Sequence, residues 1–227
     1  ERFRDEEDAW VAIYTANGEV FCAGGDLKDG EGSVGTFAGT FWEKPTINSF
    51  ESGMELFKPT IAAVHGPCLG YGLTGILFCD FVIASTTAEF GFPEVKLGVP
   101  TIVGAIRLPQ RVGWANAMEL LLTGERISAQ RAKEIGLVDE IVPQERLLER
   151  ANEWITDMAG KPPELFRALK RTITKSIPLD DETLERLTQD DFLTYFRAEE
   201  STARLRDLVD GKGMGKDKAA SAARPGA

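Results

Sequence analysis

The sequence predicts an α/β core followed by a helical C-terminal region. Short apolar segments rich in β-branched residues alternate with helical segments over most of the chain, whereas the last third shows helical patterns only. The composition, with 43% hydrophobic and 27% charged residues, is typical of a globular protein that buries a sizeable core. A chain of 227 residues is long enough for one domain or two.

Strands are expected where short apolar segments stand between turn residues. These segments are residues 10–14, 20–22, 60–64, 81–84 and 138–142. Residues 29–44 separate the second segment from the third and contain several glycines, which predicts a mobile loop. The aromatic residues of this loop would either fold over something apolar or dock on the protein surface, and both remain open: Phe37, Phe41 and Trp42.

Helices are expected where apolar residues recur at helical spacing between capping residues. One helix over 114–122 should end at Gly124, and Ser128 should cap a helix over 129–135 that ends at Gly136. Residues 69–79 are almost wholly apolar, which predicts a helix buried on all sides. The remaining predicted helices are 47–57, 144–158, 164–176 and 181–209.

These patterns divide the chain into three regions. We expect an α/β core over residues 1–142, a helical region over 143–210 and a disordered tail over 211–227. The first residues read as the end of a charged helix followed by a strand. Either the native chain starts at this point, or an N-terminal strand and helix are missing from the sequence.

Composition excludes several classes of function. The 26 Lys and Arg against 36 Asp and Glu give a net charge of −10, which argues against a general nucleic-acid-binding protein. No apolar segment approaches the roughly 18 residues of a membrane span, so we expect no membrane association. The three cysteines (Cys22, Cys68 and Cys79) cannot all pair, which favours a reducing, cytoplasmic location. Because His65 is the only histidine, a His-rich metal site and most His-based triads are excluded, and we expect no metal.

Three segments could carry chemistry, and the first is FCAGGDLK at residues 21–28. A predicted strand ends there in small residues, which lets a ligand lie directly on the backbone. The alternative is an ordinary Gly-Gly turn. The second segment, residues 59–80, runs from a buried strand through a glycine-rich bend into the apolar helix, whose N-terminus favours an anion or oxyanion.

The second segment also matches the dinucleotide fingerprint G-x-G-x-x-G over residues 70–75. Two observations disfavour that interpretation. The bend before the motif is long and contains Pro67, and the next strand ends in Ser85-Thr86-Thr87 instead of the acid that binds a ribose.

The third segment, FGFPEVKLGVP at residues 90–100, places Glu94 among apolar residues. An acid in such surroundings suits proton transfer near neutral pH, whereas the alternative is a solvated surface glutamate.

In this order the segments resemble the crotonase superfamily, the enoyl-CoA hydratase/isomerase family. The resemblance covers about residues 8–160 and includes KPTIAAVHGPCLGYG, CDFVIAS and RLPQRVGWANAMELLLTGERISAQRAKEIGLVDEIVP. It implies a stack of β-β-α units with C-terminal helices in trimer contacts, and therefore a homotrimer or a dimer of trimers. It also implies an acyl-CoA thioester substrate, with coenzyme A entering as part of that substrate and no separate cofactor.

The resemblance assigns roles to particular residues. The oxyanion hole for the thioester carbonyl would be formed by the backbone N–H groups of Gly25 and Tyr71. Glu94 would transfer the proton. The backbone of four residues would line the coenzyme A site: Cys22, Gly24, Asp26 and Leu27.

The sequence departs from the family pattern at three places. Thr74 stands where two-carboxylate hydratases have a glutamate, and Tyr71 replaces a glycine. Residues 101–105, TIVGA, replace a glycine-rich stretch, which would narrow the acyl pocket or change its lining. The resemblance therefore implies hydration of a 2-enoyl-CoA or isomerisation of its double bond, with Glu94 acting as the main acid–base group and Thr74 able to hold a water. A catalytically weak acyl-CoA-binding member is the alternative, and an NAD(P)-dependent oxidoreductase is a remote one.

Overall fold

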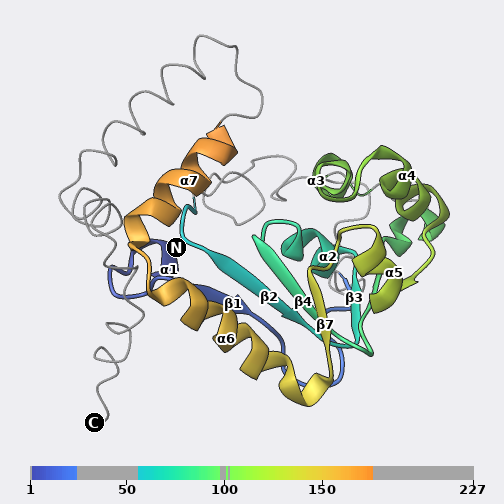
Figure 1. Ribbon diagram of the computed structural model, residues 1–227. Coiled ribbons are helices and arrows are strands. Elements are labelled where there is room, and N and C mark those ends of the chain that lie inside the picture. Colours follow the sequence, from blue (N-terminus) through green and yellow to red (C-terminus); the bar gives the residue numbers. More distant parts are fainter. Residues whose placement is uncertain (1, 25–55, 98–100, 102, 176–227) are drawn as a thin grey trace. The chain divides into compact units, whose positions relative to one another are not determined.

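The computed structural model describes residues 2–24, 56–97, 101 and 103–175 (Figure 1). Contacts within the chain divide it into two compact units. The first, here called the core unit, comprises Glu1–Leu56 and Thr60–Glu153, and the second comprises Phe57–Pro59 and Trp154–Ala227. Every residue of the candidate site belongs to the core unit.

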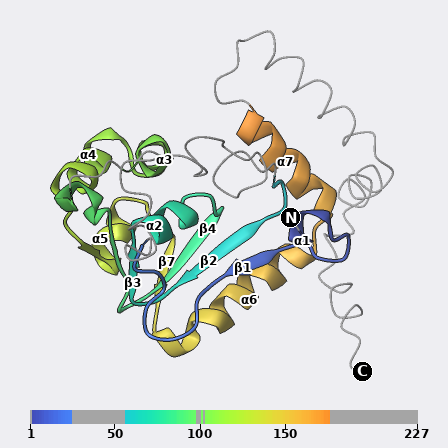
Figure 2. The same cartoon turned by 180° about the vertical axis from the view of Figure 1, so that it is seen from behind.

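The larger sheet of the core unit has four parallel strands in the order β1-β2-β4-β7. Figure 2 shows β1 at one edge of this sheet beside β2. Every residue of β2 is buried, as expected for a strand in the middle of a parallel sheet that is covered on both faces. The strands are β1 (Ala12–Tyr14), β2 (Thr60–Val64), β4 (Phe81–Ser85) and β7 (Glu140–Val142).

The smaller sheet positions the glycine-rich bend. It contains β3 (Pro67–Leu69), β5 (Glu89–Gly91) and β6 (Ile127–Ser128), with β3 parallel to β5 and β5 antiparallel to β6. Cys22 adds an isolated parallel bridge to Cys68 of β3. This bridge places the start of the segment 21–28 next to the bend.

Helices of the core unit pack against its two sheets. The buried core joins both sheets to α2–α5 and includes Phe90, Phe92, Leu73 and Leu108. The α-helices are α1 (Arg2–Asp5), α2 (Tyr71–Ile76), α3 (Val103–Val112), α4 (Trp114–Thr123), α5 (Ala129–Glu134), α6 (Leu147–Ala159) and α7 (Pro163–Lys175). Two 3₁₀ helices are Pro93–Leu97 and Gln144–Arg146. Within the described part of the chain, each helix falls short of the length and apolar character that a bilayer span requires.

Several predicted elements are confirmed. The strand over 60–64 is present with the same bounds, and 81–84 is β4 extended by one residue. Gly124 ends α4 in the left-handed conformation, with φ 63°. The Ser128 hydroxyl accepts a hydrogen bond from the backbone N–H of Arg131 and caps α5, as expected.

Other predictions were wrong or incomplete. Residues 20–22 form no strand beyond the Cys22 bridge. The helix predicted over 69–79 spans only Tyr71–Ile76, because Leu69 pairs within β3 and Gly70 adopts φ 53°. That helix is not buried on all sides, since Tyr71 is 58% exposed.

Helix α3 and strands β3, β5 and β6 were not predicted, because Pro109 interrupts the pattern of α3 and each of these strands is only two or three residues long. The expected loop over 29–44, the tail over 211–227 and the helix over 181–209 lie outside the described residues, as does 47–57 except for its last two residues.

Two aspartates hold the strands of the larger sheet in register. Asp80 Oδ2 accepts hydrogen bonds from the N–H and hydroxyl of Thr60, at 2.7 and 2.9 Å. Asp139 Oδ2 accepts from the N–H of Val82 at 2.6 Å and from Arg111 at 2.7 Å. Arg111 lies on α3, so the same carboxylate also ties this helix to the sheet.

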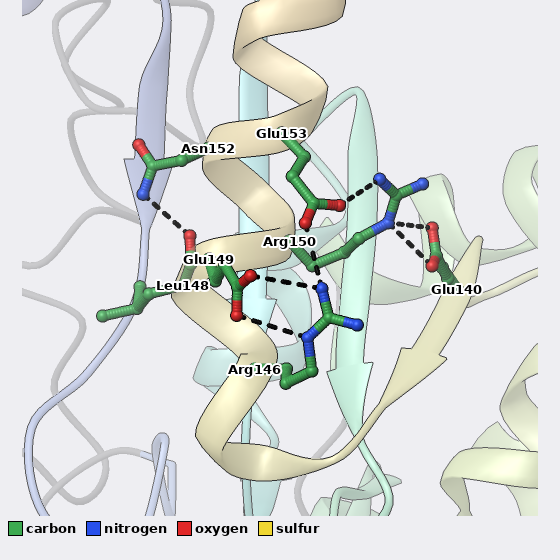
Figure 3. A network of polar contacts seen from close by, with 7 residues as sticks. All are labelled: Glu140, Arg146, Leu148, Glu149, Arg150, Asn152 and Glu153. Atoms are coloured by element: carbon green, nitrogen blue, oxygen red, sulfur yellow. Dashed lines mark hydrogen bonds and ion pairs between the residues drawn. The ribbon is translucent and has the colours of Figure 1, made fainter.

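A network of charged side chains fastens β7 to the first turns of α6 (Figure 3). Arg150 donates to both carboxylate oxygens of Glu140, at 2.8 and 3.0 Å, and to Glu153 at 2.6 Å. Arg146 pairs with Glu149 and with the same Glu153. The hydrogen bond to Glu140 is the main cause that raises the pKa of Arg150. Because these groups are partly exposed, the network mainly orients α6 and adds little stability.

The contact between α2 and Cys22 leads to a prediction about stability. In an open helix, replacement of glycine by alanine is favourable by up to about 1 kcal/mol. At Gly72, however, a Cβ would collide with the Cβ of Cys22 and lie 3.0 Å from its Sγ. We therefore expect Gly72→Ala to lower the free energy of unfolding by about 1–3 kcal/mol, measured by urea denaturation.

A matched control is Gly160→Ala, because nothing lies within 4 Å of the added Cβ. This variant should unfold like the parent. Combining Gly72→Ala with Cys22→Gly removes the colliding atom and should recover part of the loss. A Gly72→Ala protein as stable as the parent would contradict the close contact.

Candidate active site

Glu94 is the second residue of a short 3₁₀ helix, Pro93–Leu97, that follows β5. The two oxygens of its carboxylate have different surroundings. Oε1 accepts a hydrogen bond from the hydroxyl of Thr101 at 3.4 Å. Oε2 is buried and has no hydrogen-bond partner among the residues that the structure describes. A buried carboxylate oxygen without a partner is unfavourable, so the site is suited to receive a hydrogen-bond donor or a proton there.

Gly70 lies directly against this carboxylate. A Cβ at Gly70 would be 2.6 Å from Glu94 Oε1 and 3.6 Å from the Cα of Gly24. The φ of 53° at Gly70 is also in the region that favours glycine. A side chain at this position would therefore strain the backbone and displace the carboxylate.

Backbone hydrogen bonds join the Cys22–Gly24 stretch to β3, which leads into the bend at Gly70. The N–H of Cys22 donates to the carbonyl of Pro67 at 3.0 Å, and the N–H of Leu69 donates to the carbonyl of Cys22 at 2.8 Å. Gly24 follows with φ 107°. The structure thus brings the Cys22–Gly24 stretch and Glu94, which contain predicted site residues, together at the bend formed by Gly70.

Tyr71 is the first residue of α2, directly after the bend. Backbone N–H groups in the first turn of a helix have no acceptor within that helix. The ring of Tyr71 is 58% exposed, so it is turned away from the core. No residue other than glycine has a positive φ among those described, so Tyr71 adopts its position without backbone strain.

Thr74 lies one turn further along α2 and is only 5% exposed. Its hydroxyl oxygen would be 3.1 Å from a Cβ at Gly104, the second residue of α3, and Phe92 contacts the same point. Thr74 therefore faces the start of α3. Thr74 and Glu94 are both among the described residues, and no hydrogen bond joins their side chains.

Three predicted site residues, Gly25, Asp26 and Leu27, lie outside the described residues. The pairing of the Gly25 and Tyr71 amides as an oxyanion hole therefore stays a prediction. So does the role of Asp26 and Leu27 in binding coenzyme A.

Other titratable groups near the bend are poorly suited to chemistry. Burial raises the pKa of the Cys68 thiol well above its ordinary value, so no reactive thiolate forms there. Burial and the neighbouring Cys22 raise the pKa of Tyr14. His65 is buried, with Nε2 3.0 Å from the carbonyl oxygen of Gly18. The described ranges contain no group of three or more His, Cys, Asp or Glu residues that could hold a metal ion.

Sequence reasoning missed two features of the site. Thr101 was noted only as part of an altered stretch, although its hydroxyl contacts the predicted acid. The contact between Gly70 and Glu94 was also missed, because 24 positions separate them in the sequence and no periodicity connects them. The only signal available was the density of glycines in the bend.

Comparison with known proteins agrees with this geometry. A family model described as enoyl-CoA hydratase/isomerase matches residues 1–213. An enoyl-CoA isomerase/hydratase of Mycosarcoma maydis is 39% identical over 177 residues, which are 75% of this chain and 63% of that protein. A carnitinyl-CoA dehydratase of Proteus mirabilis is 36% identical over 203 residues, which are 86% of this chain and 75% of that protein. The chain thus spans less than two thirds of the length of the Mycosarcoma protein.

The fold is similar to that of solved enoyl-CoA hydratases. The crystal structure of one from Bacillus anthracis superposes with a TM-score of 0.79 at 33% identity, covering 92% of this chain and 82% of that one. The predicted crotonase-like α/β fold is confirmed by this match. The chain therefore belongs to the enoyl-CoA hydratase/isomerase family.

Proposed function

We propose that the protein acts on an acyl-CoA thioester, with Glu94 as the group that transfers the proton. One observation carries this proposal. The buried Oε2 of Glu94, which has no hydrogen-bond partner among the described residues, belongs to a carboxylate that packs against bare backbone at Gly70, close to Gly24. Bare backbone gives a substrate room to lie close to both the acid and the main-chain amides.

The proposed chemistry develops negative charge on the thioester oxygen. When the carboxylate takes a proton from Cα of a 3-enoyl-CoA, the electron pair delocalises onto that oxygen. The amides of Gly25 and Tyr71 would stabilise it, and loss of one such donor typically costs about 3 kcal/mol in activation energy. Return of the same proton to Cγ yields the 2-enoyl-CoA, so atoms and charges balance.

Hydration is the second candidate reaction. Glu94 would take a proton from a water whose oxygen bonds to Cβ of a 2-enoyl-CoA, and would then deliver that proton to Cα. The water needs a second partner for orientation, and the hydroxyl of Thr74 is the group proposed for this task. The burial of Thr74 against the start of α3 favours isomerisation, whereas the names of the relatives include both reactions.

The remaining expectations are part of the same proposal. Coenzyme A would lie along the backbone of Cys22, Gly24, Asp26 and Leu27, and the protein would assemble as a homotrimer or a dimer of trimers.

The dinucleotide interpretation of residues 70–75 has little support, because the motif joins β3 of the smaller sheet to a helix of only six residues.

Replacing Glu94 tests the proposal directly. We expect Glu94→Gln to lower turnover of 2-enoyl- or 3-enoyl-CoA by about 10²–10⁴-fold, because an amide cannot accept and return the proton. Binding of the thioester should persist. The measurement is incubation with a panel of 2-enoyl-, 3-enoyl- and 3-hydroxyacyl-CoA thioesters, with products identified by chromatography and mass.

The matched control is Glu89→Gln, five positions earlier in β5, which removes only an exposed ion pair with Arg126. It should retain parental turnover. Full activity of Glu94→Gln would refute the assigned role. Saturable thioester binding by the parent without turnover would instead identify a catalytically weak acyl-CoA-binding protein.

Thr74→Val separates the two candidate reactions. Valine matches the shape of threonine but cannot hold a water, so hydration of 2-enoyl-CoA should fall about tenfold, the equivalent of roughly 1.4 kcal/mol. Isomerisation of 3-enoyl-CoA should stay within about twofold of the parent. Equal effects on both reactions, or no effect on either, would show that Thr74 has no role in holding the water.

A further inference from the structure

The two carboxylate oxygens of Glu94 are not equivalent, and among the described residues only Thr101 donates a hydrogen bond to one of them. Oε1 receives a hydrogen bond from the hydroxyl of Thr101 and lies against the backbone of Gly70. Oε2 receives no hydrogen bond from any described residue and is shielded from solvent. Because the terminal torsion of glutamate is broad and roughly two-fold, the two oxygens would exchange readily without an anchor.

We propose that Thr101 is a positioning residue, whose hydroxyl holds Oε1 so that Oε2 is presented to the reacting atoms. This inference rests on the proposed function of Glu94. It gives the two oxygens of Glu94 different roles, one in positioning and one in proton transfer. It also gives a role to Thr101, which belongs to the stretch 101–105 that departs from the family pattern.

The place of Thr101 in the chain suits this task. It stands seven positions after Glu94 and two before α3, which begins at Val103. The 3₁₀ helix that carries Glu94 ends at Leu97, so the hydrogen bond joins this helix to the residue two positions before α3. Threonine is branched at Cβ, which limits the directions that its hydroxyl can take. A serine there would keep the donor with less restriction, and a valine would keep the shape without the donor.

The hydrogen bond is long for two oxygen atoms, at 3.4 Å. Hydrogen bonds in active sites are often long without substrate and tighten in the complex. A carboxylate that is misplaced by about 1 Å can lose about 10²-fold in rate. The expected effect of losing Thr101 therefore falls on turnover and not on substrate binding.

The test compares Thr101→Val with Thr101→Ser in steady-state kinetics on the thioester that the parent turns over. We expect Thr101→Val to lower kcat about 10- to 100-fold with KM within about threefold of the parent. Thr101→Ser should restore most of the loss. The matched control is Thr123→Val on α4, whose hydroxyl contacts only its own helix end, and this variant should keep parental kinetics.

A double variant shows whether Thr101 acts through Glu94. In the Glu94→Gln background, Thr101→Val should cause no further loss, because the group that it positions is already absent. A purely structural role would lower kcat further in that background and would lower the thermal midpoint of Thr101→Val. If Thr101→Val fails to fold, Thr101→Ala measured against Thr101→Ser gives the same comparison.

The outcomes separate this inference from the proposed function. If Glu94→Gln loses activity but Thr101→Val matches the parent, Thr101 has no positioning role and the function of Glu94 stands. Loss of kcat in Thr101→Val that Thr101→Ser does not restore also overturns the inference. If Glu94→Gln keeps full activity, the proposed function itself fails.

Discussion

The site depends on a position where no side chain is present. Gly70 ends β3 by donating its N–H to the carbonyl of Gly91, at 3.0 Å, and begins α2 by accepting from the N–H of Thr74, at 2.9 Å. Its φ of 53° makes both bonds compatible, and its missing Cβ leaves the space that the carboxylate of Glu94 occupies. These three roles fall on one residue, so a side chain at Gly70 would disturb a strand end, a helix start and the acid together.

The sequence predicted best those elements whose signals are local. Strand β2 is a continuous apolar segment, and Ser128 and Gly136 mark the two ends of α5. The sequence therefore predicted β2 and α5 with nearly correct bounds. Strands β3, β5 and β6 are instead defined by pairing between distant segments, and two or three residues carry no periodicity. The start of α2 was predicted wrongly for the same reason, because Leu69 pairs with Gly91 of β5 and the N–H of Gly70 donates to the carbonyl of Gly91.

The candidate site was predictable to a similar extent. Glu94 and the glycine-rich bend could be singled out, because an acid in an apolar segment and a cluster of glycines can be recognised from the sequence alone. The direction of Thr74 toward α3 was not, since packing against Phe92 and Gly104 decides it. The contact from Thr101 could not be predicted either, because the spacing of seven positions between a hydroxyl and an acid does not by itself indicate a contact.

A site with one well-placed carboxylate imposes a constraint on its chemistry. In the reactions proposed above, Glu94 must accept a proton and give it back, so the proton must not escape to solvent between the two steps. The burial of Glu94 Oε2 limits that exchange, because bulk water does not reach the oxygen in this structure. A buried, unpartnered oxygen is unfavourable in the resting protein, but the same condition strengthens its interaction with a donor brought by the substrate. Under the proposed function, Thr74 in place of a second glutamate is thus compatible with proton transfer by a single carboxylate, provided that Glu94 is held in place.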